Sequence, residues 1–206
     1  MELFISSLIT FFVVIDPPGC APIYAGLTAG VPGHHARAMA LRAVLVAGAI
    51  LVVFALFGQD ILGALHISLD SFRIAGGIML FLIALEMVFE KRTQRREDRA
   101  QKLLDTPEIE DVSIFPMAMP MIAGPGSIAS IMLLMSKGHG VERTLVILAA
   151  LGTILLMTYA ALALAGPLMR ILGARIEAVI TRVLGVLLAA LAAQFVIDGL
   201  RGSFIQ

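Results

Sequence analysis

Ile15-Asp16-Pro17-Pro18-Gly19-Cys20-Ala21-Pro22 interrupts an apolar segment that begins near the start of the chain. Its prolines remove backbone N–H donors, and each ring clashes with the preceding helical turn. Gly19 permits backbone angles that other residues avoid. Irregular backbone at membrane depth survives only where protein or a water-filled cavity surrounds it. We therefore expect a broken helix here, with Asp16 facing the interior, because an ionisable group at this depth is costly.

A second interruption, Met119-Pro120-Met121-Ile122-Ala123-Gly124-Pro125-Gly126-Ser127, follows about 107 to 110 residues later. Two glycines bracket Pro125, which favours another helix break. The free N–H groups of a half-helix that starts near Ser127 would suit an anion such as a carboxylate. For either motif alone, an ordinary proline kink is the alternative. The two motifs together, at matching positions, indicate one shared site near the bilayer midplane.

Further landmarks recur at the same offset in the two halves of the chain. Leu62-Gly63-Ala64 precedes Arg73 and Gly76 as Leu172-Gly173-Ala174 precedes Arg182 and Gly185. Each half carries three apolar stretches, and an odd number of spans inverts the second copy. Inverted repeats with broken helices that meet near the midplane are typical of secondary transporters.

The composition is that of a membrane protein. Apolar residues make up 59% of the 206 residues and charged residues 15%, with a mean hydropathy of +0.97, whereas soluble domains are about a quarter charged. Six stretches reach the length of about 20 residues that a bilayer requires. They are Leu3 to Tyr24, Ala38 to Gly58, Phe72 to Phe89, Ile114 to Met135, Thr144 to Gly166 and Ile180 to Leu200. The predicted fold class is an all-α membrane protein of six transmembrane helices in two inverted three-helix repeats, with helices 1 and 4 broken near the midplane.

The expected organisation is a single transmembrane domain over residues 1–206. Repeat one covers about 1–90, a cytoplasmic connector about 91–112, and repeat two about 113–206. Placing the N-terminus outside leaves eleven of the 15 Lys and Arg residues on the inner side, as the positive-inside rule requires. This predicts a multi-pass protein of the cell inner (cytoplasmic) membrane with both termini outside the cytoplasm.

Other polar residues receive more modest interpretations. Glu86 in the third span is a candidate carrier of a coupling ion, or else it reaches the inner interface beside Glu90. Arg73 is expected to be an interfacial anchor or a loop-capping donor. The lone Cys20 excludes an intrachain disulfide. The histidines lack metal-ligand spacing, and the net charge of zero gives no sign of a nucleic-acid partner. The sequence predicts no cofactor and no metal.

The two interruptions carry a family resemblance that extends over essentially the whole chain. The motifs Ile15-Asp16-Pro17-Pro18-Gly19-x-x-Pro22 and Pro116-x-x-x-Pro120-x-x-x-Gly124-Pro125-Gly126 resemble those of the MarC family of bacterial and archaeal inner-membrane proteins. The resemblance implies six spans, an N-terminus outside and a relation to transporters of small neutral amino acids such as glycine, alanine or threonine, with Na⁺ or H⁺ coupling left open. The family usually has Asn where this chain has Cys20, so its substrate preference could differ.

The leading hypothesis is a secondary transporter that is not an enzyme, with a small amino acid as substrate, the lipid bilayer as surroundings and a coupling cation. No Walker motif is present, so ATP is not the expected energy source. The predicted substrate-binding residues are Asp16, Pro18, Gly19, Cys20, Gly124, Pro125, Gly126 and Ser127, and the ion-coupling candidates are Asp16 and Glu86. A membrane-embedded lipid-phosphate hydrolase and a non-transporting accessory membrane protein are the alternatives. The sequence leaves open whether the chain forms an oligomer, which substrate it carries and in which direction.

Overall fold

The computed structural model describes residues 1–89, 111–136, 138 and 140–204. In these residues the chain is helical throughout its regular elements and contains no β-strand. The elements are α1 (Glu2–Ile15), α2 (Pro17–Leu27), α3 (Gly33–Ala64), α4 (Leu69–Val88), η1 (Ser113–Ile122), α6 (Pro125–Ser136), α7 (Val141–Ala163) and α8 (Ala165–Phe204). The predicted all-α membrane class is confirmed.

Five stretches are long and apolar enough to cross a membrane as they stand, and a bent pair supplies a sixth. Helices α1 and α2 together form the first span, Glu2–Leu27, and meet at Asp16. The bent pair is η1 with α6, whose axes differ by 51°. Both breaks therefore fall where the proline-rich motifs predicted them.

The outer bounds of two helices differ from the prediction. Helix α3 is 32 residues long, so it extends beyond the apolar stretch at both ends. Helix α8 begins at Ala165 and is 40 residues long, and the part of it that is a candidate membrane span, Ala178–Phe204, contains the predicted stretch Ile180 to Leu200. Pro167 does not prevent a helix start at Ala165, because the first turn of a helix tolerates proline. The connector predicted for residues 91–112 lies almost wholly outside the described residues.

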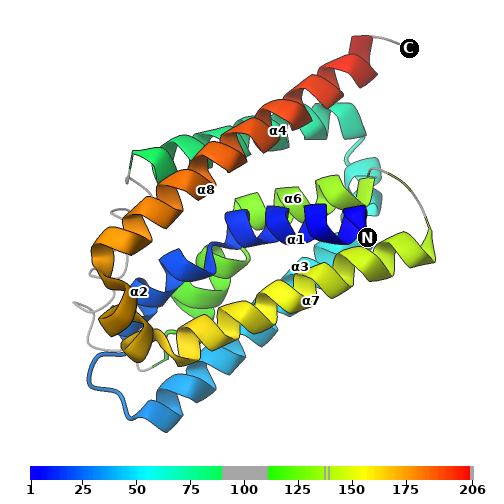
Figure 1. Cartoon of the computed structure of the whole chain (residues 1–206). Helices are drawn as coiled ribbons and strands as arrows, with labels where there is room; N and C mark the ends of the chain where they lie inside the picture. Colours follow the sequence, from blue (N-terminus) through cyan, green and yellow to red (C-terminus); the bar gives the residue numbers. More distant parts are fainter. Residues whose placement is uncertain (90–110, 137, 139, 205–206) are drawn as a thin grey trace.

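The broken spans occupy the middle of the bundle (Figure 1). Helix α1 contacts α6, α7 and α8, while α2 contacts α7, α8 and η1. Helices α4 and α8 run along each other, and α3 lies against α6, α7 and η1. Met1 and Phe204 lie at the same end of the bundle, which we call the terminus end (Figure 1). An even number of spans requires this; which side of the membrane that end faces stays a prediction.

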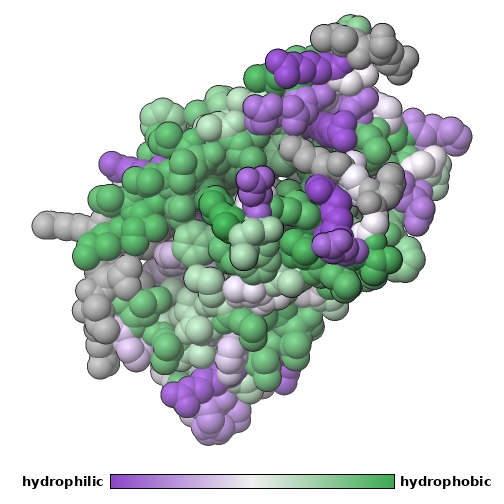
Figure 2. Space-filling model, turned by 45° about the vertical axis from the view of Figure 1, so that its right-hand side comes forward, coloured by the Kyte–Doolittle hydropathy of each residue, from purple (hydrophilic) through white to green (hydrophobic). Residues whose placement is uncertain are grey.

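The outward faces of the long helices are strongly apolar. Leu45 and Val53 on α3, Leu156 on α7 and Val186 on α8 are all at least half exposed. Much of the face in Figure 2 is apolar, and hydrophilic residues gather at its upper right and lower edges. Helices surrounded by lipid show this arrangement, because lipid tails are as apolar as the interior of the bundle and an apolar side chain is stable on either side.

Candidate functional site at the two helix breaks

Asp16 is the joint between α1 and α2. Its backbone is left-handed, with φ 58° and ψ 64°, a conformation that Asp tolerates better than most residues. It ends α1 and also caps α2, because its Oδ1 accepts a hydrogen bond of 3.1 Å from the Gly19 amide. The side chain is 1% exposed. Pro17 and Pro18 occupy the first positions of α2, where a missing N–H is harmless.

The Asp16 carboxylate explains why position 19 is a glycine. A Cβ at Gly19 would lie 2.2 Å from Oδ2 and 2.7 Å from Cγ of Asp16. No side chain fits there while the carboxylate caps the helix. The DPPG motif is therefore a single unit, in which the acid, the prolines and the glycine each depend on the others.

The second break is more irregular than the first. In η1, Phe115 and Met119 have extended backbone, with ψ of 125° and 127°. Each precedes a proline, and the proline ring disfavours helical angles in the residue before it. Regular helix begins only at Pro125, and its first backbone bond runs from the Ile128 amide to the Gly124 carbonyl, at 3.0 Å.

One side-chain contact recurs across both breaks. Cys20 Sγ donates to the carbonyl of Ile15 at 3.5 Å, and Ser127 Oγ donates to the carbonyl of Ile122 at 2.7 Å. Both bonds are buried and both span five residues. Because Ile15 and Cys20 precede Ile122 and Ser127 by the same 107 positions, the two breaks share a local design. Cys20 thus binds backbone across the break.

The two breaks adjoin in the interior. A Cβ at Gly126 would lie 3.3 Å from Val14 Cγ1, two residues before Asp16. Ile15 and Cys20 belong to the same buried hydrophobic cluster as Ile122 and Ala123. Of the eight predicted binding residues, six are buried, Pro18 is half-buried and Pro125 is exposed. The six are Asp16, Gly19, Cys20, Gly124, Gly126 and Ser127. Whether they bind a substrate stays a prediction.

Gly126 marks a close approach of helices. A Cβ at this position would also lie 2.7 Å from Ile83 Cδ1 and 3.4 Å from Leu80 Cδ2, both on α4. Helix α4 thus packs directly on the second break. The space at Gly126 is taken up by α1 and α4, so a larger side chain there would disturb helix packing.

The comparisons with known proteins agree with this architecture. A family model described as "MarC family integral membrane protein" matches residues 1–204. The chain belongs to the MarC family. The UPF0056 membrane protein MJ1677 of Methanocaldococcus jannaschii is 37% identical over 209 residues, covering 100% of this chain and 99% of the relative. The UPF0056 membrane protein YhcE of Escherichia coli is 31% identical, covering 95% and 91%. No solved structure matches the chain.

The start of α6 is better suited to an anion than the start of α2 in this MarC protein. In α2, Pro17 and Pro18 lack amides and Gly19 donates to Asp16. In α6 only Pro125 lacks an amide, and no backbone bond within the described residues takes up those of Gly126 and Ser127. Partial positive charge at a helix N-terminus favours carboxylates.

Glu86 lies on α4, the helix that packs on the second break. It follows Ile83 by one turn of α4, and Ile83 is the residue that approaches Gly126. Three residues of helix advance by about 4.5 Å. Glu86 is half-buried and takes part in an interaction within the protein. It stays a candidate for ion coupling.

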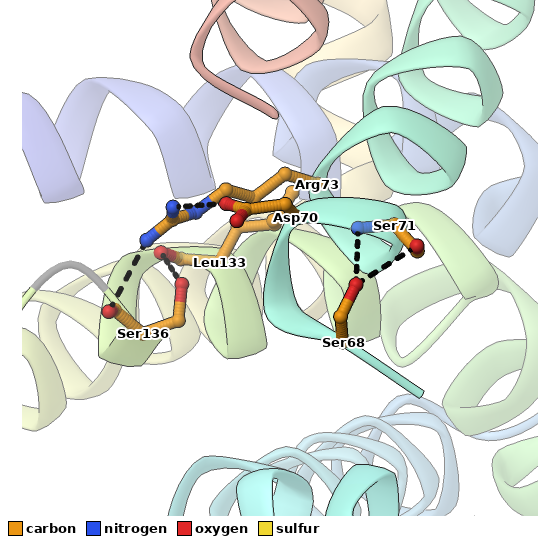
Figure 3. A network of polar contacts seen from close by, with 6 residues as sticks. All are labelled: Ser68, Asp70, Ser71, Arg73, Leu133 and Ser136. Atoms are coloured by element: carbon orange, nitrogen blue, oxygen red, sulfur yellow. Dashed lines mark hydrogen bonds and ion pairs between the residues drawn. The ribbon is translucent and has the colours of Figure 1, made fainter. Parts of the chain in front are cut away.

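The far end of α6 is held by side chains from three other helices. Arg73 Nη2 donates to the Ser136 carbonyl at 3.4 Å, Gln59 to the Met135 carbonyl at 3.3 Å and Arg143 to the Leu134 carbonyl at 3.2 Å. Arg73 also pairs with Asp70 at 2.8 Å (Figure 3). Of the two roles predicted for Arg73, interfacial anchor or loop-capping donor, its contact with the Ser136 carbonyl agrees with the second. Cations are favoured at helix C-termini, where carbonyls lack partners.

Sequence reasoning missed two serines of the central half-helices. Ser7 on α1 and Ser130 on α6 are both 0% exposed. Neither hydroxyl has a hydrogen-bond partner among the described residues. A serine in an apolar run gives no sign of which neighbour it will face, so only the packed helices reveal them. In the same described part of the chain, no three His, Cys, Asp or Glu residues are grouped to hold a metal ion.

Proposed function

We propose that the protein is a secondary transporter that moves small neutral amino acids, of the glycine, alanine and threonine kind, across the cytoplasmic membrane. The proposal rests on one observation above the others. Two proline-broken spans adjoin in the core, and each break carries the same side-chain bond, from Cys20 to Ile15 and from Ser127 to Ile122. Paired breaks of this kind are where transporters of inverted-repeat construction bind their substrates.

The chemistry at the breaks suits a zwitterion. The amides of Gly126 and Ser127 would hold the carboxylate at the start of α6. The buried carboxylate of Asp16 would attract the ammonium group or a coupling cation, since opposite charges interact strongly away from water. Glycines and prolines leave little room, so small side chains are favoured.

Alternating access would move the half-helices against α3, α4, α7 and α8. Equivalent helices of the two proposed repeats contact each other, α3 with α7 and α4 with α8. This is the arrangement expected if one repeat rocks against the other around a fixed site. Na⁺ or H⁺ coupling through Asp16 and Glu86 is part of the proposal, and so is the assignment that the protein performs transport without catalysing a reaction.

Counterflow in proteoliposomes tests the proposal. Vesicles loaded with unlabelled glycine, alanine or threonine should take up the same labelled amino acid, and an imposed Na⁺ or pH gradient should identify the coupling ion. Asp16→Asn should abolish the signal. Asp60→Asn, at an exposed position of α3, is the matched control and should retain it. If no amino acid exchanges in either direction, the proposed function is wrong.

A further inference from the structure

The hydroxyls of Ser7 and Ser130 are buried and have no hydrogen-bond partner among the described residues. Several other buried hydroxyls among the described residues donate to a carbonyl of the preceding turn, as serine and threonine commonly do in helices; the hydroxyl of Ser113, at the start of η1, is an exception outside the central half-helices. Thr10 donates to Ser6 at 2.8 Å and Thr158 to Ile154 at 2.8 Å. Ser7 and Ser130 lack such a bond, although both are 0% exposed. A buried hydroxyl without a partner is unfavourable, so its retention points to a group that visits it.

Both serines lie on the seam where α1 meets α6. Helix α1 runs from the terminus end to the first break, and α6 runs from the second break back to the terminus end, so the two are antiparallel neighbours (Figure 1). Their register is fixed by the approach of Val14 to Gly126. Ser7 lies two turns from Val14 on the same line of α1, and Ser130 lies one turn from Gly126 on the same line of α6.

The register between α1 and α6 gives the distance of each hydroxyl from the breaks along the helix axis. Four residues of helix advance by about 6 Å and seven by about 10 Å. Ser130 and Thr10 therefore lie level with each other, about 6 Å from Val14 toward the terminus end, and Ser7 lies about 10 Å from it. The three hydroxyls form a ladder, which we call the α1–α6 seam: Ser7, Thr10 and Ser130.

The seam leads from the breaks to the capped end of α6. Beyond Ser7, the last carbonyls of α6 are tied to Arg73, Arg143 and Gln59. Figure 3 shows the Arg73 side of this cap, with Asp70 holding the guanidinium. The hydroxyls are thus enclosed between the two breaks and this polar cap.

We propose that the α1–α6 seam is a second binding station, through which a small zwitterionic substrate passes between the breaks and the terminus end. This rests on the proposed function. Hydroxyl groups both donate and accept hydrogen bonds, so the same ladder serves a carboxylate and an ammonium group. The seam carries no charge, which suits a ligand of zero net charge and disfavours an ion travelling alone.

Thiol accessibility tests the seam without requiring transport. In a Cys20→Ser background, which keeps a donor to the Ile15 carbonyl, Ser7→Cys and Ser130→Cys would be exposed to a small hydrophilic methanethiosulfonate reagent in nanodiscs, and the extent of modification followed by mass spectrometry. Val13→Cys and Ala129→Cys are the matched controls, because these buried residues lie on the same two helices at other angles. We expect seam cysteines to react at least about tenfold faster than the controls, since reactivity follows access to water.

Glycine at saturating concentration should slow the seam reaction and leave the control rates unchanged. Equal rates at seam and control positions would overturn the seam, whether or not counterflow is observed. Fast modification without protection by glycine, alanine or threonine would overturn its role as a substrate station. Fast, protected modification in a protein that shows no counterflow would support the binding station and refute transport.

Conservative variants provide a second measurement. Ser7→Ala and Ser130→Ala each remove a hydroxyl that lacks a protein partner, so both should fold with an unchanged or higher Tm. In counterflow, each should raise the KM by about threefold to tenfold, as expected for one lost hydrogen bond to the substrate. Ser6→Ala, at an exposed position beside Ser7, should leave the KM unchanged. Unchanged KM values for both seam variants would contradict the proposal.

Discussion

Replacing Gly19 with alanine should disrupt the joint at the first break through one identifiable atom pair. The new Cβ would lie 2.2 Å from Asp16 Oδ2, so the carboxylate has to move by about 1 Å to restore a normal contact. Moving it sacrifices the 3.1 Å hydrogen bond from the Gly19 amide. We expect Gly19→Ala to fold less stably, with the Asp16 carboxylate as the cause.

The magnitude follows from two opposing terms. A hydrogen bond to a charged group contributes about 1.5–3 kcal/mol. Alanine is better than glycine inside a helix by about 0.5–1 kcal/mol. The net loss for Gly19→Ala is therefore about 0.5–2.5 kcal/mol. In an Asp16→Gly background the carboxylate is absent, so the same substitution should be neutral or stabilising by up to about 1 kcal/mol. The coupling between the two sites equals the hydrogen-bond term, about 1.5–3 kcal/mol, which is the upper part of the range for residues in contact.

Circular dichroism during unfolding by SDS in mixed micelles measures all four members of this cycle. The chain contains no Trp, so helix signal is a better probe than intrinsic fluorescence. Gly26→Ala is the matched control on the same helix, because a Cβ at Gly26 meets nothing within 4 Å. If Gly19→Ala lowers the free energy of unfolding as much without the Asp16 carboxylate as with it, the capping explanation for the Asp16-Pro17-Pro18-Gly19 motif is wrong.

Four further predictions concern function, packing, topology and pH. Asp16→Asn should keep the Tm, because Asn also caps helices and tolerates the left-handed backbone, but should abolish counterflow; retained counterflow would reduce Asp16 to a structural cap. Gly126→Val should destabilise the protein by about 1–3 kcal/mol through overpacking against Ile83, and Ile83→Ala should relieve part of that loss in the double variant, as a thermal melt would show. A cysteine at Gln101 in the Cys20→Ala background should resist an impermeant thiol reagent in intact cells and react after lysis; labelling in intact cells would reverse the predicted orientation. Burial opposes ionisation of Asp111, but hydrogen bonds from Ser113 and the Arg42 guanidinium hold its pKa below the usual 3.8. The contribution of this carboxylate to the free energy of unfolding is therefore present above pH 3.8 and lost as the pH falls through the lower, folded-state pKa. Because the pair is exposed, Asp111→Asn should lower the free energy of unfolding by less than about 1 kcal/mol at neutral pH, and a larger loss, or one that persists in acid, would refute this account.

Local features of the chain were enough to predict where it crosses the membrane and where two of its spans break. Apolar stretches of bilayer length are visible in the sequence, and a bilayer admits few alternatives to a helix. The breaks are equally local, since proline removes a donor and constrains the preceding residue wherever it occurs. Asp16, Gly19 and Gly126 could therefore be singled out before any neighbour was known.

What those residues contact depends on how the helices pack in three dimensions. The helices are apolar on nearly every side, so their sequences do not show which face meets protein and which meets lipid. That Gly126 lies against Val14 and Ile83, that Arg73 caps α6 and that Ser7 and Ser130 are enclosed all depend on the register between helices far apart in the chain. Register is set by the packing of many side chains at once, and no single motif encodes it.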